Sequence, residues 1–230
     1  MKSVELGQSH EKRKLIAHEF KPSGISNPEW ILFLGAHHGN EIEGVWLLDE
    51  IVKSWNANFK YGYGAIVWPQ INPDGVAAGN RLNAKGVDLN RNLPSKDWTA
   101  EILNPKYPPG PSPASEPETK ALVKLIADKK PRAILTVHSF SNYQININGP
   151  EPVTAWADRL KVLCNYEVTK DIGYPTPGSL GNYAGGDLQI PEITLEIERG
   201  MEREKVVRVF VPVIEASMKF WCEVLEREDL

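Results

Sequence analysis

Short apolar runs recur along the chain and alternate with longer segments of a different spacing. Three runs, at 30–36, 65–68 and 133–137, are almost continuous in apolar residues, and 193–197 is a fourth strand-like segment. Apolar runs of this length are typical of strands buried on both faces, as in a sheet covered by helices. We therefore predict four buried strands.

Between and after these strands, apolar residues recur at steps of three or four, which is the spacing of an amphipathic helix. The predicted helices are one built on Val45, Leu48, Val52 and Trp55, and three more at 115–129, 153–165 and 203–227. Strands that alternate with helices favour a single α/β domain with a mixed, mostly parallel sheet flanked by helices.

Two of these helices carry proline. In the helix at 115–129, the spacing Ser115-x-x-Glu118 predicts a capping box, and Pro117 falls in the first turn, where its missing N–H costs little. In the last helix Pro212 lies in the interior, so we expect a kink or a break there.

The least regular segments are rich in glycine and proline. The composition of residues 93–113 predicts a surface loop near the functional site. Residues 173–179, which also contain glycine and proline, predict a second loop. The sequence contains no internal repeat.

Composition narrows the class of protein. The chain has 230 residues, of which 41% are hydrophobic and 24% charged, so residues 1–230 suffice for one domain with a sizeable core. The net charge of −4 gives no reason to expect nucleic acid or an anionic membrane as a partner. The two cysteines, Cys164 and Cys222, are expected to be buried free thiols of a reducing compartment.

The beginning of the chain contains no apolar segment of the kind found in signal peptides. The longest apolar runs also fall short of the about 18 residues that a membrane span requires. A cytoplasmic protein is therefore the expectation.

Metal-binding residue types occur at the ends of two predicted strands. His38 and Glu41 follow the first strand and precede a helix, and His138 directly follows the strand at 133–137. Open α/β sheets bind ligands at the carboxyl ends of their strands, where these side chains would meet. Two imidazoles and one carboxylate suit zinc, and three protein ligands leave the fourth position open, as in catalytic zinc sites. We expect His10, His18 and His37 to be ordinary polar residues, with His37 pointing away from the ligands.

Several short motifs follow one another over most of the chain. They are His38-x-x-Glu41, Asn72-Pro73-Asp74-Gly75, Arg81, Gly86-Val87-Asp88-Leu89-Asn90-Arg91-Asn92, Ser115-Glu116-Pro117-Glu118, His138-Ser139 and Thr194-Leu195-Glu196-Ile197. In this order and spacing the chain resembles the zinc metallocarboxypeptidases. The short length and the segment 175–183 look like the bacterial murein peptide amidases, which cut the γ-D-glutamyl bond to meso-diaminopimelate in cell-wall tripeptides.

The resemblance implies a sheet of about eight strands, one zinc ion per chain and a role for each matched residue. His38, Glu41 and His138 would hold zinc, and Arg81 would stabilise the oxyanion at the scissile carbonyl. The expected substrate is a small peptide with a free C-terminal carboxylate.

Two further roles follow from the same resemblance. Asn90 and Arg91 would bind the terminal carboxylate, for which the planar fork of arginine is suited. Glu196 would be the general base and then the general acid. Glu192 and Glu198 alternate with Glu196 on one face of the strand, where any of the three could be a solvated edge charge.

Three substrate-binding candidates remain open. Carboxypeptidases of the digestive type carry a tyrosine that covers the substrate, and Tyr174 or Tyr183 lies near that place. Asp187 and the surrounding loop are candidates for binding the extra charges of diaminopimelate.

Rival functions stay open at the level of sequence. The aspartoacylase and succinylglutamate desuccinylase group also has His-Gly-Asn-Glu and Asp-Leu-Asn-Arg, but the motifs around Asn72 and Glu116 fit it poorly. A carboxypeptidase for ordinary peptide C-termini would share the same site chemistry. A non-catalytic peptide-binding module would be favoured if a ligand or Glu196 were missing, and all are present.

Overall fold

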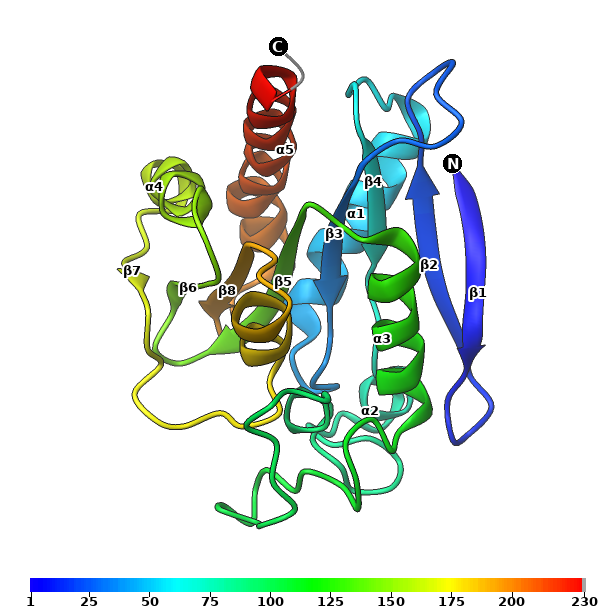
Figure 1. Cartoon of the computed structure of the whole chain (residues 1–230), viewed down its shortest axis with the longest axis vertical. Helices are drawn as coiled ribbons and strands as arrows, with labels where there is room; N and C mark the ends of the chain where they lie inside the picture. The colour runs from blue at the N-terminus through cyan, green and yellow to red at the C-terminus, as the bar shows by residue number, and fades with distance from the viewer. Residues whose placement is uncertain (229–230) are drawn as a thin grey trace.

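One mixed sheet of eight strands crosses the molecule in the computed structural model, which describes residues 1–228 (Figure 1). In sheet order the strands are β1 (Lys2–Gln8), β2 (Lys14–Phe20), β4 (Gly64–Trp68), β3 (Trp30–Gly35), β5 (Ala133–Phe140), β8 (Glu192–Glu198), β6 (Gln144–Asn148) and β7 (Val168–Thr169). The four strands predicted from apolar runs are β3, β4, β5 and β8, which lie side by side and parallel at the centre. The α/β fold with a mixed sheet is thereby confirmed.

Strands at the two margins of the sheet were not predicted. On one side β1 and β2 add an antiparallel hairpin, and on the other β6 pairs antiparallel with β8. These strands lack long apolar runs; β6, for example, reads Gln-Ile-Asn-Ile-Asn. β2 and β6 depend on pairing with β4 and β8, which are distant in sequence, and β1 is held by β2, so no local apolar pattern records these strands.

Helices cover both faces of the sheet. The longer ones are α1 (Ile42–Ala57), α3 (Pro117–Lys129), α4 (Val153–Cys164) and α5 (Arg203–Glu228), and the short ones are α2 (Pro73–Ala78), the 3₁₀ turn η1 (Leu89–Arg91) and the π-helical η2 (Gly181–Asp187). Figure 1 shows α3 on one face of the sheet and α1 and α5 on the other. The four longer helices confirm the helical patterns read from the sequence.

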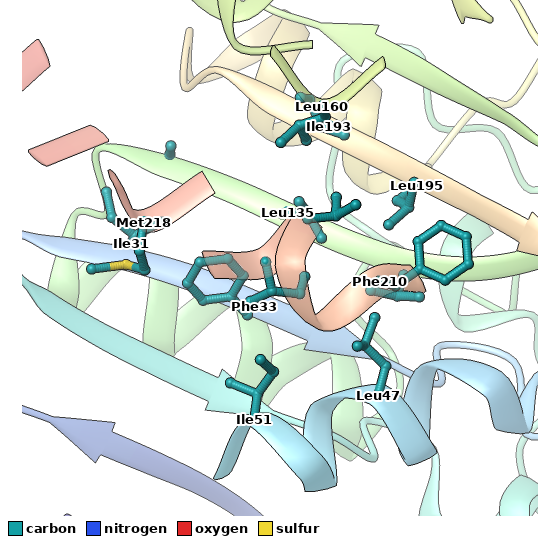
Figure 2. Close-up of a cluster of buried hydrophobic side chains, with 14 of the residues drawn as sticks. Ile31, Phe33, Leu47, Ile51, Leu135, Leu160, Ile193, Leu195, Phe210 and Met218 are labelled. Atoms are coloured by element: carbon teal, nitrogen blue, oxygen red, sulfur yellow. The ribbon is translucent and has the colours of Figure 1, made fainter. Parts of the chain in front are cut away.

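The two faces carry separate hydrophobic cores, which explains why β3 and β4 have no polar side chain. In β3, Ile31 and Phe33 belong to the core beneath α1, α4 and α5, whereas Leu32 and Leu34 belong to the core beneath α3. Figure 2 shows how Phe33, Leu47 and Phe210 approach one another in the first of these cores. The polar groups needed for chemistry are therefore confined largely to strand ends and loops.

Two details of the helices differ from prediction. The capping box is wrong: α3 begins at Pro117, its N-cap is Glu116, and no side chain caps it. Ser115 Oγ instead donates to Glu116 Oε1 at 2.6 Å and accepts from Asn92 Nδ2 at 2.9 Å, because tertiary partners compete for it. Pro117 does stand in the first turn, as predicted.

The expected break at Pro212 is also wrong, because α5 continues through this residue as one helix. An interior proline costs about 3 kcal/mol. Phe210, Val213 and Ile214 beside it are fully buried, and each buried side chain of this kind contributes about 1.5–3 kcal/mol. Packing on the sheet therefore outweighs the lost hydrogen bond.

The sheet also separates the three glutamates of β8, any of which could have been a solvated edge charge. This strand is internal, between β5 and β6, and Glu192 is fully buried while Glu198 is exposed. In the part of the chain described, no helix is both long and apolar enough to cross a membrane.

A pair of leucines three residues apart on α4 tests the packing. Leu160 is fully buried and faces the core in Figure 2, whereas Leu163 is 46% exposed. We expect Leu160→Ala to lower the free energy of unfolding by about 2–5 kcal/mol, because it removes buried contacts and leaves a cavity. Leu163→Ala should change it by less than about 0.5 kcal/mol. Urea unfolding of both variants checks this, and equal effects would contradict the assignment of the core face.

Candidate metal centre and active-site cavity

Three side chains meet at the carboxyl edge of the central strands. His38 and Glu41 lie between β3 and α1, and Glu41 is the N-cap residue of α1. His138 lies near the carboxyl end of β5, at the same edge. His138 Nδ1 is 2.8 Å from Glu41 Oε2 and 3.1 Å from His38 Nδ1, and His38 Nδ1 is 3.0 Å from Glu41 Oε1. All three residues are buried. The structure therefore brings together the three ligands expected from sequence.

This donor set fits zinc. Tetrahedral ligands with bonds of about 2.1 Å lie about 3.4 Å from one another, close to the separations found here. Burial alone would raise the pKa of Glu41, but His38 and His138 hold it well below its ordinary value, so the carboxylate is charged. Burial lowers the pKa of His138, which favours the neutral imidazole that a metal needs. Lone pairs thus converge from three buried donors, as a cation requires.

Asp88 fixes the orientation of one ligand. His38 Nε2 lies 3.1 Å from Asp88 Oδ1, and Asp88 is fully buried at the start of η1. Although burial opposes ionisation, His38 and Arg81 keep the pKa of Asp88 well below its usual range. A proton on His38 Nε2 is therefore stabilised, which leaves Nδ1 free to ligate metal.

A cavity of about 720 Å³ opens beside the three ligands. Its lining includes every ligand and five of the other residues singled out from sequence, which are Arg81, Asn90, Arg91, Tyr174 and Glu196. Residues separated by more than 150 positions thus share one concave site.

Glu196 stands next to the ligands because β8 runs parallel to β5. In the register of the two strands, Glu196 is the partner of His138, so both side chains lie on the same face. Burial and the negative charge of Glu41 raise the pKa of Glu196 to about 8. A divalent cation at the three ligands opposes this effect, because it places positive charge beside both carboxylates.

Arg81 lines the cavity and contacts two buried carboxylates. Its Nε and Nη2 each lie 2.9 Å from Asp88 Oδ2, and its Nη1 is 3.6 Å from Glu41 Oε1. The guanidinium also packs over the ring of Tyr107, with Cζ 4.5 Å from the ring centroid. This places a fixed positive charge beside the metal ligands.

Asn90 and Arg91 lie on the neighbouring turn. The Asn90 side-chain oxygen accepts from the backbone N–H of Leu180 at 2.8 Å, which ties the turn to the segment before η2. Arg91 is 5% exposed, and its guanidinium lies 5.2 Å from the ring centroid of Tyr107 and 6.0 Å from that of Tyr174. A planar cation held beside two stacked aromatic rings is well oriented for a carboxylate.

Of the three substrate-binding candidates left open by the sequence, only one lies in the cavity lining. Tyr174 lines the cavity and stacks on Tyr107, with ring centroids 6.1 Å apart. Tyr183 packs against the core beneath α3 and is not among the described lining residues. Asp187 also lies outside that lining, where its carboxylate accepts from the backbone N–H of Lys96 at 2.6 Å.

Sequence reasoning missed other residues of the site. Arg199 lines the cavity and donates from Nη2 to Glu41 Oε1 at 2.9 Å, although it lies only three residues after Glu196. Tyr107 comes from the long loop predicted at 93–113, where no periodicity marks one residue above another. Strand alternation could not have suggested Arg199, because it lies one residue beyond β8 and three positions after Glu196, an odd step that predicts the opposite face.

The expectation for His37 is wrong. Its ring stacks on that of His138, with centroids 5.4 Å apart and planes 14° apart, and its Nδ1 lies 3.3 Å from Thr136 Oγ1. Burial and the neighbouring histidines lower its pKa well below the usual value. It is therefore a neutral ring that supports a ligand from behind, brought there by the bend after β3, where Ala36 has a positive φ of 49°.

Comparison with known proteins gives a consistent result. Residues 1–226 match the family described as zinc carboxypeptidase. Murein peptide amidase A of Escherichia coli K12 is 30% identical over 203 residues, which cover 83% of this chain and 81% of the amidase. The crystal structure of murein-tripeptide amidase from Escherichia coli O157 is similar with a TM-score of 0.73 at 25% identity, over 94% of this chain and 90% of that one.

The fold also resembles that of a larger enzyme. Carboxypeptidase A from Helicoverpa armigera has a TM-score of 0.81 at 16% identity, over 96% of this chain and 68% of that one. At this identity the likeness speaks for the fold alone.

Replacement of a ligand tests the metal centre. We expect zinc-loaded protein to hold about one ion per chain, and His38→Ala to hold close to none after gel filtration, because two ligands seldom retain zinc. His18→Ala, at a half-buried histidine of β2, should keep the full content. Mass spectrometry of the metal checks both. Full zinc content in His38→Ala would place the ion elsewhere, for example at His10, Glu116 and Glu118, which also approach one another.

Removal of the charge at Asp88 tests its role in orienting His38. We expect Asp88→Asn to weaken zinc affinity by about 10–100-fold, the range usual for groups that hold a ligating histidine. Asp171→Asn, at an acid that lines the cavity but contacts none of the ligands, should leave the affinity unchanged. Competition with a chromophoric chelator measures both, and unaltered affinity in Asp88→Asn would show that His38 is oriented without this partner.

Proposed function

Since the chain belongs to the zinc carboxypeptidase family, and is thus a zinc-dependent hydrolase of peptide bonds, we propose that it releases meso-diaminopimelate from the murein tripeptide L-alanyl-γ-D-glutamyl-meso-diaminopimelate. The observation that carries this substrate is the match of 83% of the chain to a protein named murein peptide amidase A. The polar cavity with an arginine at its wall supports it, because a short peptide with a carboxylate end fits such a site.

Each group at the cavity has a part in the proposed reaction. Zinc bound at His38, Glu41 and His138 supplies a Lewis acid and lowers the pKa of a bound water toward about 7. Glu196 takes the proton from the attacking water and later delivers it to the amine of the leaving amino acid. Its position opposite His138 supports this role.

Charge and orientation come from the arginines. Arg81 stabilises the oxyanion that develops at the scissile carbonyl, and a fixed donor of this kind typically contributes about 3 kcal/mol. Asn90 and Arg91 bind the terminal carboxylate, and Tyr174 covers the substrate from the loop above Arg91. Support for Tyr174 over Tyr183 and Asp187 is that it lines the cavity.

The remaining expectations belong to the same proposal. We propose that residues 1–230 form one catalytic domain that acts in the cytoplasm on small peptides. The family match over residues 1–226 supports one catalytic domain. The two free cysteines support the cytoplasm, which is a reducing compartment.

The test is release of diaminopimelate from the tripeptide by the zinc-loaded protein. We expect Glu196→Gln to lower kcat by about 10²–10⁴-fold with zinc content unchanged, because general acid–base catalysis contributes this much. Glu198→Gln is the matched control, since Glu198 is exposed two residues further along the same strand.

Other outcomes would redirect the proposal. Cleavage of ordinary peptide C-termini, with the tripeptide left intact, would make the protein a conventional carboxypeptidase. Cleavage of N-acyl amino acids alone would favour deacylase activity, and binding of peptides without turnover would favour a recognition module.

A further inference from the structure

The wall of the cavity formed by β6 and β8 is polar although it belongs to the interior of the sheet. Along one face of β8 stand Glu192, Thr194 and Glu196, and Asn148 and Asn146 of β6 are the register partners of Glu192 and Thr194. Neighbouring positions on the other face of the same strands, such as Ile193 and Leu195, are apolar and buried. These residues, Asn146, Asn148, Glu192 and Thr194, are called the polar wall.

Glu192 is the unusual member of the polar wall. Its side chain is fully buried, Oε2 accepts from Asn148 Nδ2 at 2.8 Å and Oε1 accepts from Thr194 Oγ1 at 2.9 Å. Both donors are neutral, and within residues 1–228 no cationic group pairs with this carboxyl. Burial accordingly raises the pKa of Glu192 to about 7. A buried carboxyl without a counter-charge is costly to fold around, and the proposed hydrolysis gives Glu192 no role.

The partners of Glu192 connect it to the cavity. Asn146, Asn148 and Thr194 all line the cavity, two and four strand positions deeper than Glu196. On the opposite side η2 covers Asn148 closely, since a Cβ at Gly181 or Gly185 would lie within 2.6 Å of that side chain. This inner end of the cavity, the polar slot, thus has amide and hydroxyl groups on its wall and one carboxyl behind them.

The geometry points to an ammonium-bearing side chain on the leaving amino acid as the occupant of this slot, with Glu192 as the specificity-determining counter-charge behind Asn148 and Thr194. An amide oxygen and a hydroxyl oxygen accept hydrogen bonds from an ammonium, and a negative charge one residue behind them compensates its desolvation. An apolar side chain would bring no positive charge to the buried Glu192 carboxyl and would exclude water from the amide and hydroxyl groups without a new hydrogen bond, which is unfavourable.

The inference deepens the proposed function, on which it rests, because diaminopimelate carries an ammonium at the end of its side chain. It also makes Glu192 the counter-charge for this ammonium, instead of Asp187, which lies outside the cavity lining. The lining of the cavity also includes charges of both signs, among them Lys170 and Asp171.

The experiment compares C-terminal residues that differ in the ammonium. Four zinc-loaded proteins, the wild type, Glu192→Gln, Glu192→Asp and Glu118→Gln, are assayed with L-alanyl-γ-D-glutamyl peptides that end in diaminopimelate, lysine or norleucine. Glu118 is an equally buried carboxyl of α3 outside the cavity, which makes it a control for general destabilisation. The readout is the ratio of kcat/KM for lysine over norleucine, which a purely structural role would not move.

We expect the wild type and Glu118→Gln to prefer the two ammonium-bearing peptides by on the order of tenfold or more. Glu192→Gln should lose this preference through KM, with kcat for the norleucine peptide unchanged, and Glu192→Asp should recover part of it. Equal loss on all peptides in Glu192→Gln, or a wild type without the preference, would overturn the inference. If Glu192→Gln does not fold, product inhibition of the wild type decides: free lysine must inhibit at lower concentration than norleucine.

A second substrate pair separates this inference from the function on which it rests. Benzoylglycyl-lysine and benzoylglycyl-norleucine have an ordinary peptide linkage and the same two side chains. If they are cleaved with the lysine preference while the γ-D-glutamyl peptides are not, the murein assignment fails and the role of Glu192 stands. If the γ-D-glutamyl peptides are cleaved without a preference for lysine, the murein assignment stands and the role of Glu192 fails.

Discussion

One buried carboxylate organises the site of this zinc carboxypeptidase. Asp88 accepts from Arg81 through one oxygen, while the other lies 3.1 Å from His38 Nε2 and accepts from the backbone N–H of Asn90 at 2.9 Å. One member of the His-Glu-His cluster, the guanidinium of Arg81 and the turn that carries Asn90 and Arg91 are therefore held by the same two oxygen atoms. Since Asp88 is fully buried and charged, its partners are held by more than the weak attraction of surface pairs.

The sheet decides where such chemistry can stand. Both faces of β3 and β4 are buried under helices, so polar side chains there would be costly unless they found partners. The ends of β3 and β5 carry the ligands instead, and the register of β8 with β5 brings Glu196 to His138. The α/β architecture thus separates a stable apolar centre from a polar edge at which groups distant in sequence converge.

The wall of β6 and β8 departs from this separation. It places amides, a hydroxyl and a carboxyl inside the sheet, next to apolar residues on the opposite face of the same strands. Violations of this kind are expected at functional positions, where stability is lost in exchange for recognition. In the proposed function, the general base and the slot for the leaving side chain would lie along this one strand, with Glu196 toward its carboxyl end and Glu192 at its beginning.

Local sequence determined the central strands, the four longer helices and the identity of the metal ligands, because apolar periodicity and strand-end positions are properties of short segments. Only the tertiary structure decided the pairing of β2 and β6, the stacking of His37 on His138, the approach of Arg199 to Glu41 and the presence of Tyr174, not Tyr183, in the lining of the cavity. It likewise decided that α5 passes through Pro212 and that Ser115 is held by Asn92 instead of capping α3. Each of these depends on a partner many residues away, whose free energy outweighs a local preference and leaves no trace in the periodicity of either segment.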